Sequence, residues 1–277
     1  MSSMIKNRRI LIAGGAGSIG SELVRQLAPK NKIFILDISE NAYGLSEELK
    51  QKGYWVEPRV GDIRNKDTVA DIFEDFKPQI VINSAAYKEV PPMEIYPREA
   101  KDVNIDGNLN LLEEARKWEC LEKFIFISTD KVISSCSVMG ASKRFSEIAT
   151  INKKGVVVRF GNVMGSRGSL IPIWQRQHDT GQPLTVTHEN MSRYMMTIPQ
   201  ACELVIKAIE ESSGGEIFIM KMGQRYNILE LAKKIVKSTG QQIRMIGVRP
   251  GETFTENLMF EEEKCRAKEE KNFYIIK

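Results

Sequence analysis

Residue types that bind metals or form disulfides are scarce in this 277-residue sequence, which has four cysteines and two histidines. The cysteines are Cys120, Cys136, Cys202 and Cys265, and the histidines are His178 and His188. The cysteines lie far apart and form no Cys-x-x-Cys pair, which argues against a zinc site and against a disulfide framework. Two histidines are too few for a histidine-based metal site. We therefore expect no metal and a location in the reducing cytoplasm.

Long apolar runs and a strong charge of one sign are also missing. No run approaches the roughly 20 apolar residues of a membrane span. The apolar stretch after Arg8-Arg9 is short and runs into glycines, so it is typical of a strand and not of a signal peptide. The net charge is only +4, and basic and acidic residues are interleaved, as in Glu261-Glu262-Glu263-Lys264. These absences argue against a membrane or a nucleic acid as partner and leave an anionic small molecule held in a pocket.

The hydrophobic residues, 42% of the chain, form short runs that alternate with helical patterns. The predicted strands are Arg9–Ala13, Lys32–Asp37, Val56–Gly61, Ile80–Ala85, Phe124–Ser128, Gly155–Phe160 and Ile243–Val248. The predicted helices are Ser18–Ala28, Asn41–Lys50, Asp67–Phe76, Val103–Trp118, Ala141–Thr150, Ile198–Glu211 and Ile228–Ser238. Strands that alternate with helices predict an α/β fold with a parallel sheet buried on both faces. After Gly161 loops predominate, and the sequence marks no clear domain boundary.

A glycine-rich turn joins the first strand to the first helix. The strand Ile10-Leu11-Ile12-Ala13 runs directly into Gly14-Gly15-Ala16-Gly17-Ser18-Ile19-Gly20. Glycines permit a tight turn and let the backbone approach a pyrophosphate, which the free N–H groups of the first helical turn then bind. Glycines also occur in plain turns, but strand, turn and helix stand here in the order that dinucleotide binding requires. The expected contacts to the dinucleotide are Gly14, Gly17, Ser18, Ile19 and Gly20.

Two acidic residues follow the second and third strands. Asp37 is placed to accept hydrogen bonds from the adenosine ribose and to repel a 2′-phosphate, which favours NAD over NADP. Asp62, next to Ile63, is a candidate for the adenine amino group, although a helix N-cap is an equally good interpretation. We therefore predict a Rossmann-type, doubly wound NAD-binding domain in residues 1–160. A smaller, interwoven lobe that binds the substrate is expected in residues 161–277.

The segment after the strand at 124–128 resembles the extended short-chain dehydrogenases/reductases. These proteins place a tyrosine and a lysine four residues apart, after a strand that ends in Ser or Thr. Here Ser128-Thr129-Asp130-Lys131 is followed by Met139-Gly140-Ala141-Ser142-Lys143. The lysine is present at the expected spacing, but Met139 occupies the position of the tyrosine.

Longer segments are similar to the UDP-N-acetylglucosamine 4,6-dehydratases of bacterial polysaccharide and flagellin-sugar pathways, including those that invert C5. The segments are Ala85-Ala86-Tyr87-Lys88-Glu89-Val90-Pro91-Pro92-Met93-Glu94, Val158 to Ser169, Thr187 to Tyr194 and Gly247-Val248-Arg249-Pro250-Gly251-Glu252. They occur in family order, and the resemblance covers about residues 8 to 275. It implies an internal redox cycle in which a nicotinamide takes hydride from sugar C4 and returns it to C6. It also implies a homo-oligomer, either a dimer or a hexamer.

The resemblance implies roles for the residues that follow the strand. Asp130 would be the general acid and Lys131 the base of the elimination, with Thr129 hydrogen-bonded near C4. Lys143 would bind the nicotinamide ribose, and Ala85 and Ala86 would contact the cofactor. Because the Met139 thioether cannot exchange a proton, the C4 hydroxyl proton needs another route, through Lys131, Thr129 or water. The alternatives without a catalytic role are a surface ion pair for Asp130 and Lys131, and an ordinary helix-surface lysine for Lys143.

The same resemblance implies the contacts of a UDP-sugar substrate. The expected contacts are Arg193 and Arg249 to the diphosphate, Asn162 to the nucleotide sugar, Lys88 and Glu89 near the sugar, and more weakly Arg167 and Glu252. The chain departs from the family at Glu89, which replaces His, and at residues 133–137, which replace an Asn-Pro-x-Asn stretch. These departures leave open an enzyme that acts on a UDP-sugar with a C5–C6 double bond. The missing tyrosine leaves open a second alternative, an inactive sensor of NAD or nucleotide sugar.

Overall fold

Short runs rich in Ile, Val and Phe form a nine-stranded central sheet with the strand order β14-β15-β11-β6-β5-β4-β1-β2-β3. The structure, a computed structural model, describes residues 5–134 and 136–277, so Ser135 of the 133–137 departure lies outside it. The strands are β1 Arg9–Ala13, β2 Lys32–Asp37, β3 Val56–Val60, β4 Ile80–Asn83, β5 Lys123–Ile127, β6 Val156–Arg159, β11 Ile217–Met220, β14 Ala267–Glu269 and β15 Phe273–Ile276. All neighbours from β3 to β11 pair in parallel.

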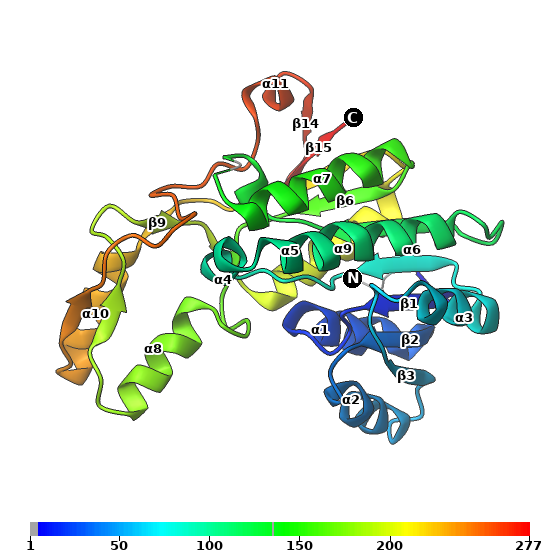
Figure 1. Ribbon diagram of the computed structural model, residues 1–277, viewed down its shortest axis with the longest axis horizontal. Helices are drawn as coiled ribbons and strands as arrows, with labels where there is room; N and C mark the ends of the chain where they lie inside the picture. Colours follow the sequence, from blue (N-terminus) through cyan, green and yellow to red (C-terminus); the bar gives the residue numbers. More distant parts are fainter. Residues whose placement is uncertain (1–4, 135) are drawn as a thin grey trace.

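Helices cover both faces of this sheet, as Figure 1 shows. On β1, Ile10 and Ile12 face one core, whereas Leu11 and Ala13 face the other, because successive strand residues point to opposite sides. Helices α1, α2 and α9 pack on the first face, and α3 and α6 pack on the second. Their bounds are α1 Ser18–Leu27, α2 Asn41–Lys50, α3 Lys66–Phe76, α6 Asn108–Ala115 and α9 Ile198–Glu211. The predicted doubly wound α/β fold is confirmed.

Several predicted element ends differ from the structure. The strand predicted to reach Ala85 ends at Asn83, because the chain turns there to pass close to Gly14. The helix predicted over 103–118 is a π-helix at Lys101–Gly107 followed by α6. Helix α7, Val138–Asn152, begins three residues before its predicted start, because the Ser137 hydroxyl accepts a hydrogen bond from the Gly140 amide and caps it. Met139 therefore lies in the first turn of α7.

The sheet continues into a part of the chain that was predicted to be mostly loops. Strand β11 pairs in parallel with β6, and β15 then pairs antiparallel with β11 and with β14. The parallel sheet therefore carries an antiparallel edge formed by β15 and β14. Each of these strands has only three or four residues, which is too short for two-residue periodicity to be recognised. The domain division at residue 160 remains a prediction.

A separate small core lies in the lobe that projects beside the sheet in Figure 1. It packs Trp174, Leu184, Met191 and Ile228 together. This lobe contains α8 Leu170–Asp179, β8 Leu184–Val186, β9 Ser192–Arg193, β12 Tyr226–Asn227, α10 Ile228–Thr239 and β13 Ile243–Met245. The sequence predicted α10 but not α8, and the strand predicted over 243–248 ends at Met245. The remaining elements are β7 Asn162–Val163, β10 Met195–Met196, α4 Val90–Ile95, α5 Pro97–Ala100 and α11 Glu261–Lys264.

A buried arginine joins the sheet to two helices. Arg159, at the end of β6, is fully buried and donates to both carboxylate oxygens of Glu147 on α7, at 3.0 and 2.8 Å. It also donates to both oxygens of Glu263 on α11, at 2.7 and 3.1 Å. Burial opposes its charge, but the two carboxylates outweigh burial and raise the pKa of Arg159. This cluster fixes the backbone immediately before Phe160, Gly161 and Asn162.

Replacing Arg159 by Met should destabilise the protein by about 3–5 kcal/mol, because two buried carboxylates lose their partner. Arg144→Met is the matched control. Arg144 is part-exposed and contacts Glu147 at 2.9 Å, so its loss should cost roughly 1 kcal/mol or less. Urea unfolding followed by circular dichroism measures both free energies. Equal losses for the two variants would contradict the assigned role of Arg159.

Candidate active site

The glycine turn makes a close approach to the loop that follows β4. Gly14 has φ +74°, and a Cβ there would lie 2.6 Å from the Ala85 amide nitrogen. A Cβ on Gly20 would collide with the Gly14 carbonyl oxygen, so helix and turn pack without side chains between them. The N-cap of α1 is Gly17, which has no side chain to satisfy the first amides of the helix. These N–H groups are therefore available to an anionic ligand.

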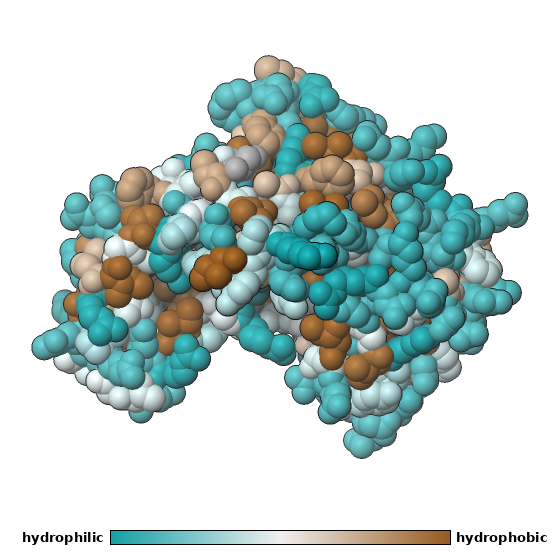
Figure 2. Space-filling model, in the orientation of Figure 1, coloured by the Kyte–Doolittle hydropathy of each residue, from teal (hydrophilic) through white to brown (hydrophobic). Residues whose placement is uncertain are grey.

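A groove of about 440 Å³ opens beside these amides. It is lined by Ala16, Gly17, Ser18, Ser21, Glu22, Arg25, Arg167, Ile198 and Pro199. Figure 2 shows the surface hollowed between the α8–α10 lobe and the part of the molecule that carries α1 and α2. The exposed Arg167 comes from the loop after β7, and its backbone amide donates to the Ser18 hydroxyl at 3.0 Å. The structure thus puts Arg167 beside the glycine turn and apart from Arg193 and Arg249.

The carboxylates of Asp37 and Asp62 lie at the ends of neighbouring strands. Asp37 accepts hydrogen bonds from the amides of Ala16 and Ser39, at 2.8 and 2.9 Å, so its oxygens lie beside the glycine turn. Asp62 forms an ion pair with Arg64 at 2.7 Å, which lowers the pKa of the Asp62 carboxyl despite the opposing effect of burial.

The interpretation of Asp62 as a helix N-cap is wrong. The side chain of Asn65 caps α3 instead, by accepting a hydrogen bond from the Thr68 amide at 3.0 Å. Ile63 is buried against Gly107. Asp62 is therefore free of a capping role and stands beside the end of β3.

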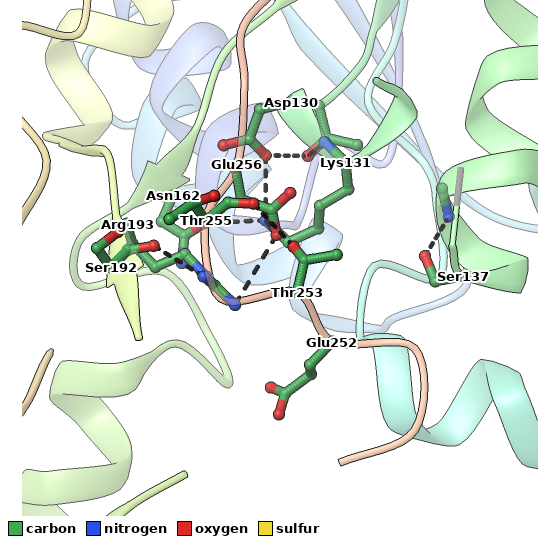
Figure 3. Close-up of polar contacts among 12 residues, drawn as sticks. Asp130, Lys131, Ser137, Asn162, Ser192, Arg193, Glu252, Thr253, Thr255 and Glu256 are labelled. Atoms are coloured by element: carbon green, nitrogen blue, oxygen red, sulfur yellow. Dashed lines mark hydrogen bonds and ion pairs between the residues drawn. The ribbon is translucent and has the colours of Figure 1, made fainter. Parts of the chain in front are cut away.

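The Thr129–Asp130–Lys131 segment turns away from β5 in a single 3₁₀ turn. Asp130 is fully buried, and its Oδ1 accepts hydrogen bonds from the Thr129 hydroxyl at 3.0 Å and from Lys131 Nζ at 3.1 Å. Lys131 Nζ also donates to Asn162 Oδ1 at 3.0 Å, as Figure 3 shows. The other carboxylate oxygen of Asp130, Oδ2, is buried without a hydrogen-bond partner. The alternative of a surface Asp–Lys pair is wrong, since the acid lies inside the protein.

Lys143 lies one α-helical turn beyond Met139, on the same side of α7. Its Nζ donates to the Ile127 carbonyl at 2.5 Å and lies 4.1 Å from the centre of the Phe126 ring. The residue is only 6% exposed, so the alternative of an ordinary helix-surface lysine is wrong. Burial lowers the pKa of Lys143 to about 7, against the opposing effect of Glu147.

Met139 is buried in a small apolar cluster with Val90, Met93 and Ala100. The cluster joins α4, α5 and α7; these four side chains have no group that transfers protons, and the Tyr87 side chain packs against them. Met139 therefore packs the first turn of α7 and offers neither a donor nor a base. The proton chemistry of this site has to come from the neighbouring polar residues.

The expected substrate residues lie at two depths. Arg193 is buried and donates to the carbonyls of Ser192 and Phe254, at 2.8 and 3.1 Å. Arg249 is exposed and pairs with Glu252 at 2.5 Å, which lowers the pKa of Glu252 although burial acts the other way.

Lys88 and Glu89 are exposed and 3.4 Å apart. Lys88 Nζ also lies 3.4 Å from the Ser166 hydroxyl, and Glu89 packs against Gly168, which has φ +73°. This pair therefore stands at the loop after β7, next to Arg167.

Sequence reasoning missed a buried acid, Glu256. Its Oε1 lies 3.9 Å from Lys131 Nζ and 3.8 Å from Arg193 Nη2, and its Oε2 has no hydrogen-bond partner. Figure 3 shows Glu256 between these two cations. Glu256 lies far from Asp130 and Lys131 in the sequence, so no local pattern indicates that it packs beside them. The only available hint was its position four residues after Glu252 of the Arg249–Glu252 motif.

Among the described residues, no group of three or more His, Cys, Asp and Glu side chains could hold a metal ion. In the same part of the chain, no helix is both long and apolar enough to cross a bilayer.

The shifted pKa of Lys143 predicts how the stability of the ligand-free protein depends on pH. Lys143 keeps its proton to about pH 7 when folded, against an ordinary value of 10.5, so between these values the unfolded chain binds the additional proton. The Lys143 contribution to stability therefore rises with pH in this window, by up to about 1.4 kcal/mol per pH unit. Lys143→Met should exceed the wild type in unfolding free energy at pH 7, and urea unfolding should show this advantage shrinking toward pH 10. If the unfolding free energies of the two proteins changed in parallel with pH, the lowered pKa of Lys143 would be contradicted.

Comparison with known proteins identifies the family of the chain. A family model described as polysaccharide biosynthesis protein matches residues 10–277. The capsular polysaccharide biosynthesis protein CapD of Staphylococcus aureus is 42% identical over 94% of this chain, which spans only 46% of CapD. A UDP-glucose 4-epimerase of Rickettsia bellii is 34% identical, with 99% of this chain and 84% of that protein covered.

Solved structures agree with this relationship. Pen from Bacillus thuringiensis superposes with a TM-score of 0.93 at 34% identity, covering 99% of this chain and 88% of Pen. The UDP-glucose 4-epimerase of Thermus thermophilus, solved in complex with NAD, gives 0.77 at 26% identity, covering 91% and 90%. With its parallel sheet, glycine turn and buried Asp130–Lys131 pair, this chain belongs to the polysaccharide biosynthesis protein family.

Proposed function

We propose that this protein is a UDP-N-acetylglucosamine 4,6-dehydratase that inverts C5 and uses NAD as an internally recycled hydride carrier. The observation that carries the proposal is the buried Asp130, hydrogen-bonded to both Thr129 and Lys131 at the carboxyl end of β5. An elimination needs an acid and a base that flank one substrate, and these neighbours supply both. The epimerase and polysaccharide relatives support a nucleotide sugar as the substrate class.

The residues at the glycine turn fit NAD. The uncapped first turn of α1 offers N–H groups to a pyrophosphate, and the free lone pairs of Asp37 suit ribose hydroxyls. The Thermus relative was solved with NAD, which supports the same cofactor here. The proposed contacts are Gly14, Gly17, Ser18, Ile19 and Gly20 to the pyrophosphate, Asp62 and Ile63 near the adenine, and Ala85, Ala86 and Lys143 toward the nicotinamide. When bound, NAD supplies a hydride acceptor that returns the hydride within the same turnover.

The arginines fit the diphosphate of a UDP-sugar. Arg193 lies beside Asn162 and the catalytic pair, whereas Arg249 stands farther out on the exposed loop with Glu252. Guanidinium groups bind phosphate oxygens through paired hydrogen bonds, so the two would hold the ligand from the buried and the exposed side. Lys88, Glu89 and Arg167 lie on the loops that border the groove.

A relay through Thr129 replaces the missing tyrosine. Because the Thr129 hydroxyl already donates to Asp130 Oδ1, it can take the proton of the sugar O4 hydroxyl while passing its own proton to Asp130. Asp130 then holds the proton that the leaving C6 hydroxyl requires. Met139, within its apolar cluster, takes no part in this transfer.

The elimination uses the same pair. A neutral Lys131 amine removes the proton from C5, the C5–C6 double bond forms, and the C6–oxygen bond breaks. Asp130 gives its proton to the departing hydroxide, which leaves as water. Once a hydride has returned to C6, a solvent proton added to the opposite face of C5 would give the inverted 4-keto-6-deoxy sugar.

Incubation with UDP-N-acetylglucosamine, followed by NMR of the product, tests the proposal. We expect a 4-keto-6-deoxy sugar without added reductant, with deuterium at C5 when the reaction runs in D₂O. Turnover of only a 5,6-ene sugar would replace the proposal by the partial reaction. A product changed only at C4 would indicate an epimerase, and NAD binding without turnover of any UDP-sugar would indicate a sensor.

Substitutions at Thr129 and Asp130 test the proton relay. Thr129→Val should lower kcat by about 10²-fold or more, because the isosteric side chain cannot carry the proton. Thr129→Ser is the matched control and should retain most of the activity. Asp130→Asn should abolish elimination, while hydride exchange at C4 continues slowly. Steady-state kinetics separate these effects, and a Thr129→Val enzyme as active as the serine variant would contradict the relay.

A further inference from the structure

Glu256 is buried in the reaction centre, yet the mechanism above does not use it. It comes from the loop after β13, far in the sequence from Asp130 and Lys131. The residue is 3% exposed, and its Oε2 is buried without a partner, as is Asp130 Oδ2. A buried carboxylate with an unsatisfied oxygen is costly, so its retention in this cluster calls for a physical reason.

The charges that face Glu256 come from three parts of the fold. Lys131 and Asp130 lie on the turn after β5, Arg193 lies on β9, and Arg225 donates to the Glu256 backbone carbonyl at 2.8 Å. Arg193 donates from Nη1 to two backbone carbonyls, and its Nη2 lies 3.8 Å from Glu256 Oε1. Arginine keeps its proton, so Lys131 is the cation here that can release one. Lys131 faces two carboxyl groups: Asp130, to which it is hydrogen-bonded, and Glu256 at 3.9 Å.

We propose that Glu256 is the proton acceptor of Lys131, which it converts to the neutral amine that removes the C5 proton. This inference rests on the proposed dehydratase function, in which Asp130 already receives the sugar O4 proton. Asp130 cannot hold a second proton for Lys131 and still act as the acid for C6. Glu256 is the remaining carboxyl group within reach of Lys131 Nζ among the described residues.

The transfer balances within the pair. One N–H bond of the Lys131 ammonium breaks, one O–H bond forms on Glu256, and a positive and a negative group become two neutral ones. The electron pair left on Nζ then accepts the C5 proton. A small side-chain rotation or one bridging water closes the 3.9 Å separation. Because inversion adds a solvent proton to the opposite face of C5, Lys131 keeps the proton that it removed and Glu256 releases its proton to solvent, which restores both groups for the next turnover.

The surroundings of Glu256 favour the protonated form. Burial raises the pKa of Glu256, and the negative charge of Asp130 adds to the effect, although Lys131 and Arg193 act in the opposite direction. A substrate diphosphate that binds Arg193 would offset part of the positive charge near Glu256. Substrate arrival therefore promotes the transfer of the proton from Lys131 to Glu256.

Kinetics of Glu256→Gln test the role in turnover, since the amide keeps the shape but cannot accept a proton. We expect kcat at pH 7 to fall about tenfold or more, with KM for the UDP-sugar within roughly twofold of the wild type. The loss should shrink as pH rises, because hydroxide then takes the place of Glu256 as the acceptor of the Lys131 proton. Glu256→Asp should recover part of the rate, and the exposed Glu261→Gln should leave it unchanged. A loss that is independent of pH, or an unaltered kcat, would overturn the proposal.

A second measurement needs neither substrate nor cofactor. Carbon-13 NMR of glutamate-labelled protein, with Glu256 assigned by its absence in Glu256→Gln, follows the titration of the carboxyl group directly. Lys131→Met should move its midpoint upward by about one pH unit or more, since one of the two cations beside Glu256 is lost. An unmoved midpoint would overturn the coupling of Lys131 and Glu256. If the coupling is seen but UDP-N-acetylglucosamine is not turned over, the substrate assignment fails and not the pair.

Discussion

The burial of the Asp130 carboxylate at the end of β5 determines what surrounds it. A buried charge is tolerated only with hydrogen bonds and an opposite charge, and Thr129 and Lys131 supply these from adjacent positions in the chain. Lys131 in turn needs Asn162, which follows β6, the neighbouring strand of the sheet. Gly161 leaves room for Asp130 Oδ2, since a Cβ there would lie 3.0 Å from that oxygen. The site is thus an arrangement in which each polar group compensates the burial of the next.

Strand β6 is also held in place by its last residue, Arg159. Arg159 is fixed by Glu147 and Glu263, so the backbone that leads to Asn162 has little freedom. Glu147 lies on α7, one turn after Lys143. The Arg159–Glu147 ion pair therefore ties the helix that carries Lys143 to the sheet that carries Lys131 on the turn after β5. The stability cluster and the reaction centre therefore share one strand. Rigid support of this kind is what proton transfer over hydrogen-bond distances requires.

Much of the N-terminal half could be predicted, because its signals are local. The strand, glycine turn and helix at 9–27, and Asp37 at the end of β2, follow from residue type and order alone. Strands β11 and β15 could not be predicted, since short apolar segments acquire strand structure only by pairing with β6 and with each other. The sequence also left open whether Asp62 caps α3; the structure shows that α3 begins at Lys66, so Asn65, directly before it, is the cap.

By itself, the sequence determined the α/β fold class, the glycine turn and the order Thr129-Asp130-Lys131, because each depends on neighbours along the chain. Only the tertiary structure decided that Asp130 and Lys143 are buried, that Met139 packs in an apolar cluster, and that Arg167 stands beside Ser18. It alone brought Glu256 to within 3.9 Å of Lys131, from a loop more than a hundred residues away in the chain. The physical reason is that burial and electrostatic coupling depend on distance in space, which local sequence patterns do not encode.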